Sequence, residues 1–525
     1  MSSTTIPVRA EVPAEYKWNL EKLYPNDEAW NADLAVYAAK EAEFAKYRGT
    51  LGGSAAALAD YLDFCRDTGI LEERLAYYSD LRQGEDEGDG AARTMTGKFM
   101  MAAARIRAAS SWDTPEIQAI ADDLMETYIA HPRMKDYAIY LRKIIRFKPH
   151  ILSEKEERLL ALHSEGESVA SETFSVLTNV DMDFGAVDTP EGRLPLSQST
   201  WSSFMENPDR AVRRAAYQAF YACFNAHKTT LASLYSGSVK HDVIRARIRK
   251  YPSARAAALF PDRVDEAVYD NLVQTVNAHL APLHRYYALR KRVLGLGELR
   301  HYDVYVPLAA GVKRATSWNE AVDLISSALA PLGDEYVSTL RAGLLGRWAD
   351  RYENKGKRSG AFSEGSYVGD PYILMNYKDD TIRDVFTLAH EGGHSMHTWY
   401  SVRNNPFMHY NYTIFEAEVA STFNEELLFR YLEQNAGALV KGDASTDAAA
   451  LRRYIINKRA DDFLSTLYRQ TMFAEFELRT HELEEGGTPL TAELLRAEYR
   501  GLLEKYFGSE ITFEEESDLE GLRIP

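Results

Sequence analysis

Apolar side chains recur at intervals of three and four residues along most of this chain, and this spacing restricts it to a largely helical fold. The stretch from Asp27 shows the pattern and stops at Gly49, and residues 207–247 repeat it over a longer span. Such intervals place apolar groups on one face of an α-helix, which can then pack against other helices. We therefore predict a mainly α-helical protein.

Two short stretches interrupt the helical pattern and predict strands. Residues 180–198 alternate apolar and polar side chains around Glu191 and Gly192, which is typical of a β-hairpin. The run Asp370–Tyr377 is short, apolar and bounded by turn residues, which indicates a further strand. The sheet content should therefore be small.

Two other local signals predict helix boundaries. The acidic, glycine-rich stretch Gly84–Ala92 predicts a loop or a break between helices. Ser153 followed by Glu156 is a capping box, in which the two side chains satisfy free backbone N–H groups at a helix start. We expect one helix to begin just after Ser153.

Length and charge limit the classes of function. A chain of 525 residues is too long for one ordinary core, so we expect several lobes or one large helical body. Its 45% hydrophobic and 26% charged residues are typical of a soluble globular protein. A net charge of −17 repels nucleic acids and anionic membranes, so neither is an expected partner.

Cysteine content and the N-terminal sequence favour a cytoplasmic location. There are two cysteines, Cys65 and Cys223, fewer than a secreted protein of this size usually carries. We expect both to pack as small apolar residues. The first residues lack the basic and apolar regions of a secretory signal, and no apolar run approaches the ~20 residues that span a bilayer.

The sequence HEGGH at residues 390–394 predicts a zinc site. His390 and His394 are four residues apart, so on a helix both imidazoles can reach one ion. Glu391 points beside that pair, where it can accept a proton from a zinc-bound water without binding the metal. The alternative is an ordinary helix with unrelated histidines, and context must decide between the two. Gly392 and Gly393 each cost a helix about 1 kcal/mol, but they would let another backbone or a substrate approach closely.

His397 shares the face of His390 but is a poor third ligand. It lies about 10.5 Å further along the helix, whereas zinc sits about 2 Å from each ligating nitrogen. We therefore reject it as a ligand. It remains a candidate for contact with the substrate or with a ligand, or an ordinary surface histidine.

A downstream helical segment, residues 412–429, offers carboxylates instead. Glu418 and Glu425 lie on one of its faces. A carboxylate there can complete a site of two histidines and one glutamate, with Glu425 hydrogen-bonded to a ligating imidazole. The alternative is a helix whose glutamates simply face solvent.

These motifs together resemble peptidase family M3 and, within it, the oligoendopeptidase F group. The resemblance covers nearly the whole chain. The segments that carry it are Val12–Trp30, 207–221, 249–260, His301–Leu308, 356–377, 390–397 and 415–425.

The resemblance implies a role for each residue of the site. His390, His394 and Glu418 would bind one Zn²⁺ per chain, and Glu391 would be the general base on a zinc-bound water. Glu425 would support a ligating histidine. The implied fold has two helical lobes enclosing a deep substrate cleft, with a small β-sheet beside the zinc helix.

The implied activity is a metalloendopeptidase that cuts internal bonds of short, unfolded peptides. The strand within 371–377 would pair with an extended peptide, which makes Tyr372 and Leu374, together with His397, candidate substrate contacts. By sequence we divide the chain into an N-terminal helical region (1–115), a helical lobe ending in the hairpin (116–200) and the catalytic domain (201–525).

From the same resemblance, we expect the catalytic domain to be shortened at its C-terminus. The family normally continues past the final residues, 518–525, with a segment rich in histidine and tyrosine that helps to hold the substrate carbonyl. An alternative function is therefore a catalytically impaired fragment or pseudoenzyme that binds zinc and peptide. A weaker alternative is a related zinc carboxypeptidase.

Overall fold

The chain forms two compact units, each built from two segments that are far apart in sequence. The computed structural model describes residues 6–163, 169–309, 315–379, 382–440 and 447–523. Unit 1 comprises residues 1–148 and 312–452, and unit 2 comprises residues 149–311 and 453–525. The division of the sequence after residues 115 and 200 stays a prediction.

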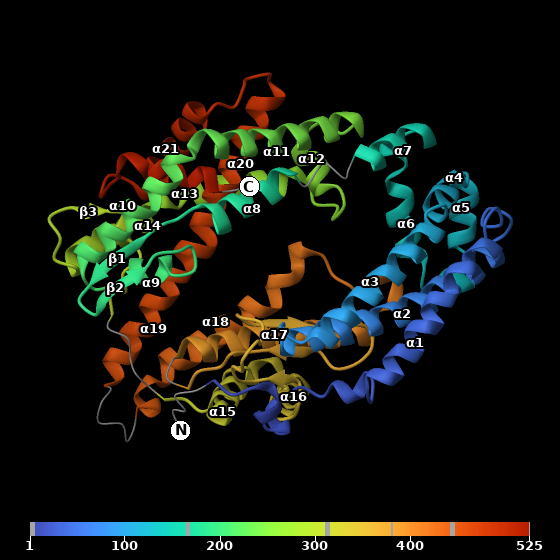
Figure 1. Ribbon diagram of the computed structural model, residues 1–525, viewed down its shortest axis with the longest axis horizontal. Helices are drawn as coiled ribbons and strands as arrows, with labels where there is room; N and C mark the ends of the chain where they lie inside the picture. Colours follow the sequence, from blue (N-terminus) through green and yellow to red (C-terminus); the bar gives the residue numbers. More distant parts are fainter. Residues whose placement is uncertain (1–5, 164–168, 310–314, 380–381, 441–446, 524–525) are drawn as a thin grey trace. The chain divides into compact units, whose positions relative to one another are not determined.

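Unit 1 is mainly helical, and aromatic side chains fill much of its core. Its α-helices are α1 (Asp27–Ala39), α2 (Ala55–Glu85), α3 (Gly90–Ser110), α4 (Asp113–Ala119), α5 (Asp122–Ile129), α6 (Ala138–Arg146), α15 (Trp318–Ala328), α16 (Asp334–Leu345), α17 (Ile382–Asn404) and α18 (Ile414–Leu439) (Figure 1). The Ser54 hydroxyl caps α2 by accepting a bond from the Ala57 N–H at 3.1 Å. Trp30 is fully buried, and its indole N–H donates to the Leu75 carbonyl at 2.9 Å, which ties α1 to α2.

A three-stranded sheet in unit 1 lies against α17. Its strands β4 (Ala349–Asp350), β5 (Phe362–Glu364) and β6 (Tyr372–Leu374) are ordered β4-β6-β5. Strand β6 pairs in parallel with β4 and antiparallel with β5. The strand predicted within residues 370–377 is therefore present, and both of its edges are paired.

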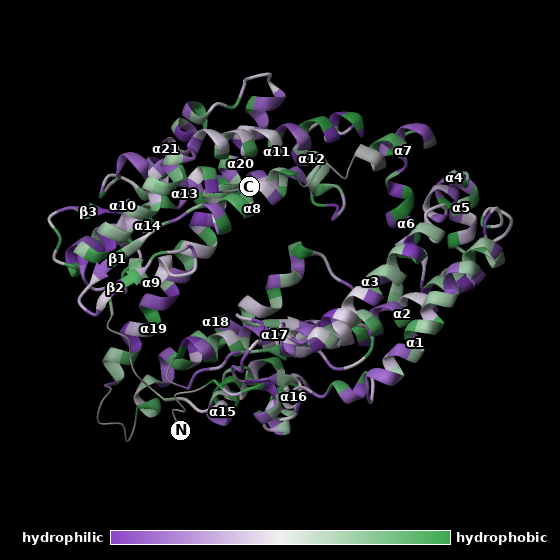
Figure 2. Cartoon of the chain, viewed as in Figure 1, coloured by the Kyte–Doolittle hydropathy of each residue, from purple (hydrophilic) through white to green (hydrophobic). Residues whose placement is uncertain are grey.

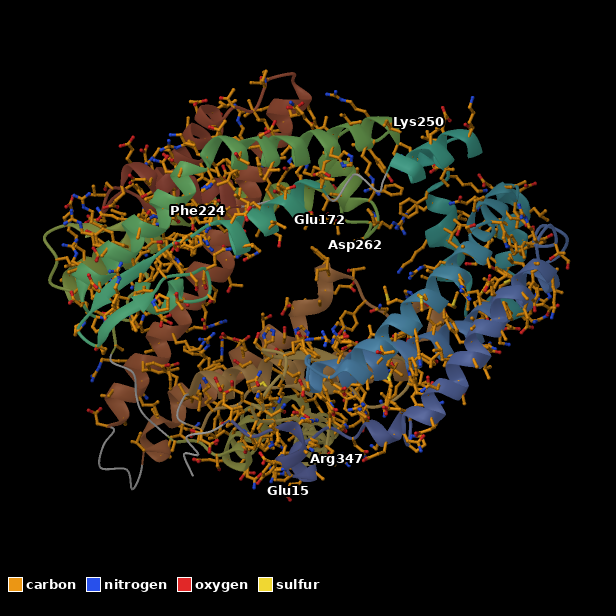
Figure 3. All side chains as sticks on the ribbon, in the orientation of Figure 1. Glu15, Glu172, Phe224, Lys250, Asp262 and Arg347 are labelled. Atoms are coloured by element: carbon orange, nitrogen blue, oxygen red, sulfur yellow. The ribbon has the colours of Figure 1, made fainter. Side chains whose placement is uncertain are left out.

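Buried charges hold the N-terminal segment of unit 1 to this sheet. Asp350, at the end of β4, is fully buried and pairs with Lys357 at 2.7 Å and with Arg9 at 2.5 Å. The Arg347 guanidinium donates to the backbone carbonyls of Lys17 and Trp18 at 3.0 and 2.9 Å (Figure 3). Since each buried charge is paired, these contacts fix the segment against β4.

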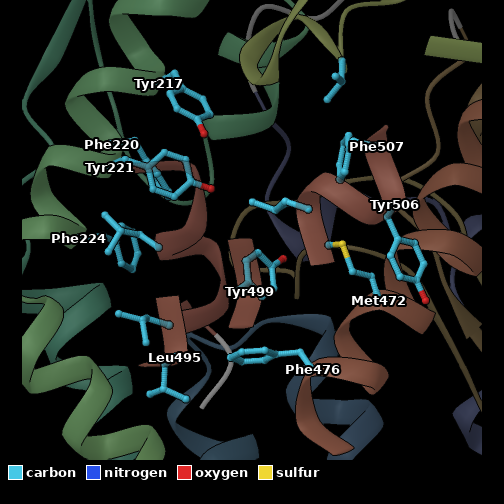
Figure 4. Packing of buried hydrophobic residues seen from close by; sticks show 14 of the residues in the cluster. Tyr217, Phe220, Tyr221, Phe224, Met472, Phe476, Leu495, Tyr499, Tyr506 and Phe507 are labelled. Carbon is cyan, nitrogen blue, oxygen red and sulfur yellow. The ribbon is translucent and has the colours of Figure 1, made fainter. Parts of the chain in front are cut away.

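Unit 2 is also helical, with two small pairs of strands. Its α-helices are α7 (Glu154–His163), α8 (Val169–Val176), α9 (Trp201–Met205), α10 (Arg210–Ala226), α11 (Lys228–Ile248), α12 (Ala254–Leu259), α13 (Glu266–Ala278), α14 (Leu280–Val293), α20 (Gln470–Glu485) and α21 (Ala492–Phe507), while α19 (Ala448–Asp462) crosses the division between the units. Aromatic residues of α10, α20 and α21, among them Phe220, Phe476 and Tyr499, meet in its core (Figure 4). Strands β3 (Leu299–Arg300) and β7 (Ile511–Thr512) pair in parallel.

The predicted hairpin is confirmed, with its turn one residue earlier than expected. Strands β1 (Ala186–Thr189) and β2 (Gly192–Pro195) pair antiparallel, with Thr189 opposite Gly192. The turn therefore consists of Pro190 and Glu191. Gly192 begins β2 at φ 127°, a conformation that residues with a side chain rarely adopt.

The predicted helix boundaries are also confirmed. Helix α2 ends at Glu85 and α3 begins at Gly90, so the acidic, glycine-rich stretch does separate two helices. At the start of α7, the Glu156 carboxylate accepts a bond from the Ser153 N–H at 2.9 Å. The Glu156 N–H returns a bond to the Ser153 hydroxyl at 3.4 Å, which completes the capping box.

The mainly α-helical class, with small sheets, is confirmed. Hydrophobic and hydrophilic residues are interleaved along the helices, as the spacing in the sequence predicted (Figure 2). The substrate cleft stays a prediction.

Candidate metal centre

The HEGGH motif lies on α17, which packs along its length against α18 (Figure 1). The two glycines of the motif explain how closely α17 meets its neighbours. A Cβ atom on Gly393 would lie 2.6 Å from the Ser421 Cα and 2.7 Å from the Ala420 carbonyl oxygen, both in the backbone of α18. A Cβ on Gly392 would lie 3.1 Å from the Leu340 side chain of α16. The expectation that a glycine admits another backbone is thus confirmed at Gly393.

A buried amide fixes the register between the two helices. Asn424 is 1% exposed, and its side-chain N–H donates to the Ala389 carbonyl at 3.1 Å. The Tyr336 hydroxyl of α16 donates to the Asn424 amide oxygen at 2.9 Å. The sequence analysis did not identify Asn424. The feature that could have identified it is its position, because Asn424 is a polar residue three positions after Ser421 and therefore lies on the same buried face of the helix.

Three side-chain donor atoms from α17 and α18 converge on one point. The Nε2 atoms of His390 and His394 are 3.2 Å apart, and Oε2 of Glu418 lies 3.3 and 3.4 Å from them. Ligand atoms about 2.0–2.1 Å from a tetrahedral zinc ion are separated by about 3.3 Å. The spacing of this group therefore fits three corners of a zinc tetrahedron, so these residues could hold a metal ion.

Local hydrogen bonds aim two of these donors. The Ser421 hydroxyl is fully buried and donates to Oε2 of Glu418 at 2.7 Å. The Nδ1 atom of His390 lies 2.5 Å from Oε1 of Glu425. When Nδ1 carries a proton and donates it to Glu425, the lone pair of Nε2 is left for a metal.

The same contacts set the pKa of His390. Burial lowers the pKa of this imidazole, but the hydrogen bond to Glu425 and the charge of Glu391 raise it above its ordinary value. For His394, burial is the largest influence and lowers the pKa, although the charge of Glu418 acts in the opposite direction. The carboxylates of Glu391, Glu418 and Glu425 thus favour a positive charge at the point where the three donor atoms converge.

Glu391 lies beside the three donors and is 6% exposed. Burial raises the pKa of its carboxyl to about 7, and the charge of Glu418 adds to this rise. The charge of His390 and a backbone hydrogen bond with Ser363 of β5 act in the opposite direction. Ser363 therefore connects the edge of the sheet to this glutamate, a contact that the sequence did not reveal.

His397 is not one of the three converging donors. Its ring stacks on that of Tyr412, with centroids 3.7 Å apart and planes at 9°. Its Nδ1 atom is buried and has no hydrogen-bond partner among the residues that the structure describes. Its contact with a substrate stays a prediction.

The structure does not support Tyr372 and Leu374 as substrate contacts. Both side chains are fully buried, and β6 is the central strand of its sheet. A peptide cannot pair with a strand whose two edges are already hydrogen-bonded. The prediction that a peptide pairs with the strand within 371–377 was wrong, because sequence alone does not distinguish a central strand from an edge strand. The outer strands β4 and β5 each have one edge that is not paired with another strand, and β5 is the one whose Ser363 contacts Glu391.

Among the residues that the structure describes, no helix is both long enough and apolar enough to cross a membrane.

Comparison with known proteins identifies the family. The model of peptidase family M3 matches residues 203–523, and that of oligopeptidase F matches residues 116–184. The chain is 41% identical to oligopeptidase PepF of Bacillus subtilis, over 99% of this chain and 76% of that protein. It is also 41% identical to the oligoendopeptidase F homolog of Borreliella burgdorferi, over 98% of this chain and 85% of that protein.

Solved structures share the fold. A crystal structure titled as a putative peptidase from Chlamydophila abortus matches with a TM-score of 0.89 at 33% identity, over 99% of this chain and 86% of the other. Oligoendopeptidase F from Enterococcus faecium matches with a TM-score of 0.70 at 30% identity, over 95% and 83% of the two chains. The chain therefore belongs to peptidase family M3 and, within it, to the oligoendopeptidase F group of metallopeptidases.

Proposed function

We propose that this protein is a zinc-dependent endopeptidase that hydrolyses internal bonds of short, unfolded peptides. The observation that carries the proposal is the triangle of donor atoms from His390, His394 and Glu418, with sides of 3.2–3.4 Å. Two nitrogens and one oxygen are a donor set that zinc accepts in hydrolytic enzymes. Zinc bound there would lower the pKa of a water and polarise a carbonyl.

In this proposal, Glu391 is the general base. Its buried carboxylate takes a proton from the attacking water and then delivers that proton to the leaving amine nitrogen. Glu425 holds the His390 ring in the orientation and tautomer that the site needs. Ser421 does the same for the carboxylate of Glu418.

We infer that an extended peptide pairs with β5. The free edge of this strand can accept main-chain hydrogen bonds from a peptide, which is a common mode of peptide recognition. The backbone hydrogen bond between Ser363 and Glu391 supports this position, because it brings the strand next to the base. Pairing through backbone atoms would tolerate many peptide sequences.

We further propose that the enzyme acts on peptides in the cytoplasm. Cys65 and Cys223 are both free thiols, which suits a reducing compartment. We expect neither nucleic acid nor membrane as a partner, because the net charge of −17 opposes both.

Zinc content and cleavage of a mixed peptide library test the function directly. We expect about one zinc per chain, internal cuts identified by mass spectrometry, and loss of cleavage when a chelator removes the metal. Zinc without cleavage would instead identify a peptide-binding pseudoenzyme. Stepwise loss of C-terminal residues would identify a carboxypeptidase, and absence of zinc would contradict the proposed ligands.

A further inference from the structure

One face of α2 contacts the two connecting segments that border the metal centre. Residues 365–371 connect β5 to β6, and residues 405–413 connect α17 to α18. Gly69, Glu73 and Tyr77 recur every four residues along α2, so they lie within about 80° of one another around its axis. Each of these three residues contacts one or both of the connecting segments, and together they form the anchor face of α2.

The Glu73 carboxylate binds both connecting segments through a single oxygen atom. Its Oε2 accepts a bond from the Tyr367 N–H at 3.1 Å and another from the Tyr410 hydroxyl at 2.8 Å. Burial raises the pKa of this carboxyl, whereas the two hydrogen bonds lower it. Since the side chain is partly buried, these bonds replace water that a carboxylate would otherwise bind.

Gly69 and Tyr77 contact the same segments on either side of Glu73. A Cβ atom on Gly69 would lie 2.7 Å from the Phe407 ring, so a side chain there would displace this ring from α2. The buried Tyr77 hydroxyl donates to the Asp370 carbonyl at 2.9 Å and accepts a bond from the Tyr372 N–H at 3.0 Å. The anchor face therefore has a contact of its own for each segment, and Glu73 is the residue that joins the two.

The two connecting segments also pack against each other. The centroid of the Tyr367 ring lies 5.4 Å from that of Phe407 and 5.2 Å from that of Tyr410. Aromatic pairs at these separations attract one another. The segments are therefore one packed layer on α2, although they lie about 40 residues apart in the sequence.

Both segments continue directly into the elements of the site. Residues 365–371 follow β5, whose Ser363 contacts Glu391. Residues 405–413 lead into α18, which carries Glu418. An anchor that is shared by the two segments therefore sets the position of β5 relative to α18.

We propose that Glu73 is a positioning residue for peptide binding, because it fixes the free edge of β5 relative to the metal ligand on α18. This inference rests on the proposed function, in which β5 pairs with a peptide and Glu418 binds zinc. Glu73 acts through the two connecting segments and not by touching the metal ligands. It keeps both segments ordered before the peptide arrives, so that binding does not bear the entropy of ordering them.

Hydrogen exchange tests the anchor without any need for activity. Glu73→Ala removes both bonds, so exchange in residues 365–371 and in residues 405–413 should become about tenfold faster. Glu73→Gln keeps an oxygen acceptor and should retain most of the protection. Tyr410→Phe removes one bond and should give a smaller increase. Faster exchange in only one segment of Glu73→Ala, or in neither, would overturn the inference.

Tyr78→Phe is the matched control for Tyr410→Phe. The Tyr78 hydroxyl also donates to a carboxylate at 2.8 Å, but its acceptor is Asp27 of α1 and Tyr78 lies on another face of α2. This variant should lose stability to a similar extent and leave exchange in both connecting segments unchanged.

Peptide affinity tests the positioning role itself. The dissociation constant of a short unfolded peptide is measured on zinc-loaded Glu391→Gln, alone and combined with each variant. Glu73→Ala should weaken binding about tenfold, because fewer molecules have both segments in place. Glu73→Gln should restore it, and Tyr78→Phe should not change it.

An unchanged dissociation constant in Glu73→Ala, or an equal increase in Tyr78→Phe, would overturn the positioning role and leave only a structural contact. Failure of the proposed function is distinguishable from either result. If the wild type neither binds nor cleaves a peptide, the proposed function falls, and hydrogen exchange alone decides whether Glu73 holds the two segments.

Discussion

Buried histidines and glutamates occur in both units, but they are arranged for different purposes. In unit 2, His301 is 1% exposed, and its Nδ1 lies 2.9 Å from the Tyr217 hydroxyl. Nearby Glu520 pairs with Arg469 and accepts a bond from the Tyr499 hydroxyl at 2.8 Å. In unit 1, the donors of His390, His394 and Glu418 face one another instead.

The two clusters differ in whether a positively charged side chain pairs with the buried carboxylate. Around His301, the charge of Glu520 is balanced by a guanidinium, and the cluster is closed to solvent. At the α17–α18 centre, lone pairs converge with no guanidinium or ammonium paired to them among the described residues, and the Glu418 side chain is more than half exposed. Converging, uncompensated and accessible donors indicate a metal site, whereas the presence of histidine and glutamate alone does not.

The largest expected effect concerns the base. Glu391→Gln should lower kcat by about 10²–10⁴-fold, because the amide cannot accept the proton. Zinc content, measured by mass spectrometry, should stay at the wild-type value. Glu426→Gln is the control, since Glu426 pairs with Arg430 on the surface of α18. A Glu391→Gln enzyme within tenfold of wild type would contradict the role of general base.

The closed cluster predicts acid sensitivity. Burial lowers the pKa of His301 from 6.5 to about 4, although the charge of Glu520 opposes this. The unfolded chain therefore binds more protons between these values. Stability from neutral His301 is complete above pH 6.5 and is lost as pH falls toward 4, by about 3 kcal/mol in all.

Urea unfolding of wild type and His301→Gln at pH 7 and pH 5 measures this effect. The difference in unfolding free energy between the two proteins should shrink at pH 5, because only in the wild type does the unfolded chain gain a proton at residue 301, which stabilises the unfolded state. His279→Gln, at an exposed histidine of unit 2, is the control and should show no such change. A pH-independent difference for His301→Gln would refute the prediction.

Gly393→Ala should separate α17 from α18. The added methyl group meets the Ser421 backbone at 2.6–2.8 Å, so the helices must move apart at a cost of about 1–3 kcal/mol. Hydrogen exchange of peptides from both helices measures this loss of local stability, and zinc titration should show weaker binding. Gly437→Ala on α18 is the matched control. A Cβ there meets nothing within 4 Å, so it should stabilise the helix by about 0.5–1 kcal/mol.

The smallest expected effect is at Glu425. Glu425→Gln replaces the charged acceptor for Nδ1 of His390 with a neutral one. Zinc affinity should fall about tenfold, within the range seen when a partner of a metal-ligating histidine is lost. Competition with a chromophoric chelator measures it. Unchanged affinity would mean that Glu425 does not support the site.

Much of this protein could be predicted from local patterns. The helical class, the hairpin, the capping box at Ser153 and the strand within 370–377 all follow from side-chain periods and from residues with special backbone preferences. The HEGGH spacing also places His390 and His394 on one face of a helix, because that needs only the helical repeat. Family resemblance, and not spacing, favoured Glu418 over its neighbouring glutamates.

Strand order and long-range contacts were not predictable in this way. The apolar run that contains Tyr372 and Leu374 predicts a strand, but the burial of these residues in the centre of a sheet depends on pairing with β4 and β5. Asn424 and Ser363 gained their roles only when α18 and β5 came against α17. The contact of Asn424 with Ala389 joins residues 35 positions apart, and that of Ser363 with Glu391 joins residues 28 positions apart.

The sequence by itself therefore determined the helices, the position of the HEGGH motif and the family, since these depend on short-range spacing and residue identity. Only the tertiary structure decided which residues outside the motif support the three donors, which strands lie at the edges of the sheet, and which face of α18 stays exposed. The physical reason is that these properties depend on packing between distant segments. A close backbone contact at Gly393 and a buried amide at Asn424 set the spacing of the donors, and no local pattern encodes that spacing.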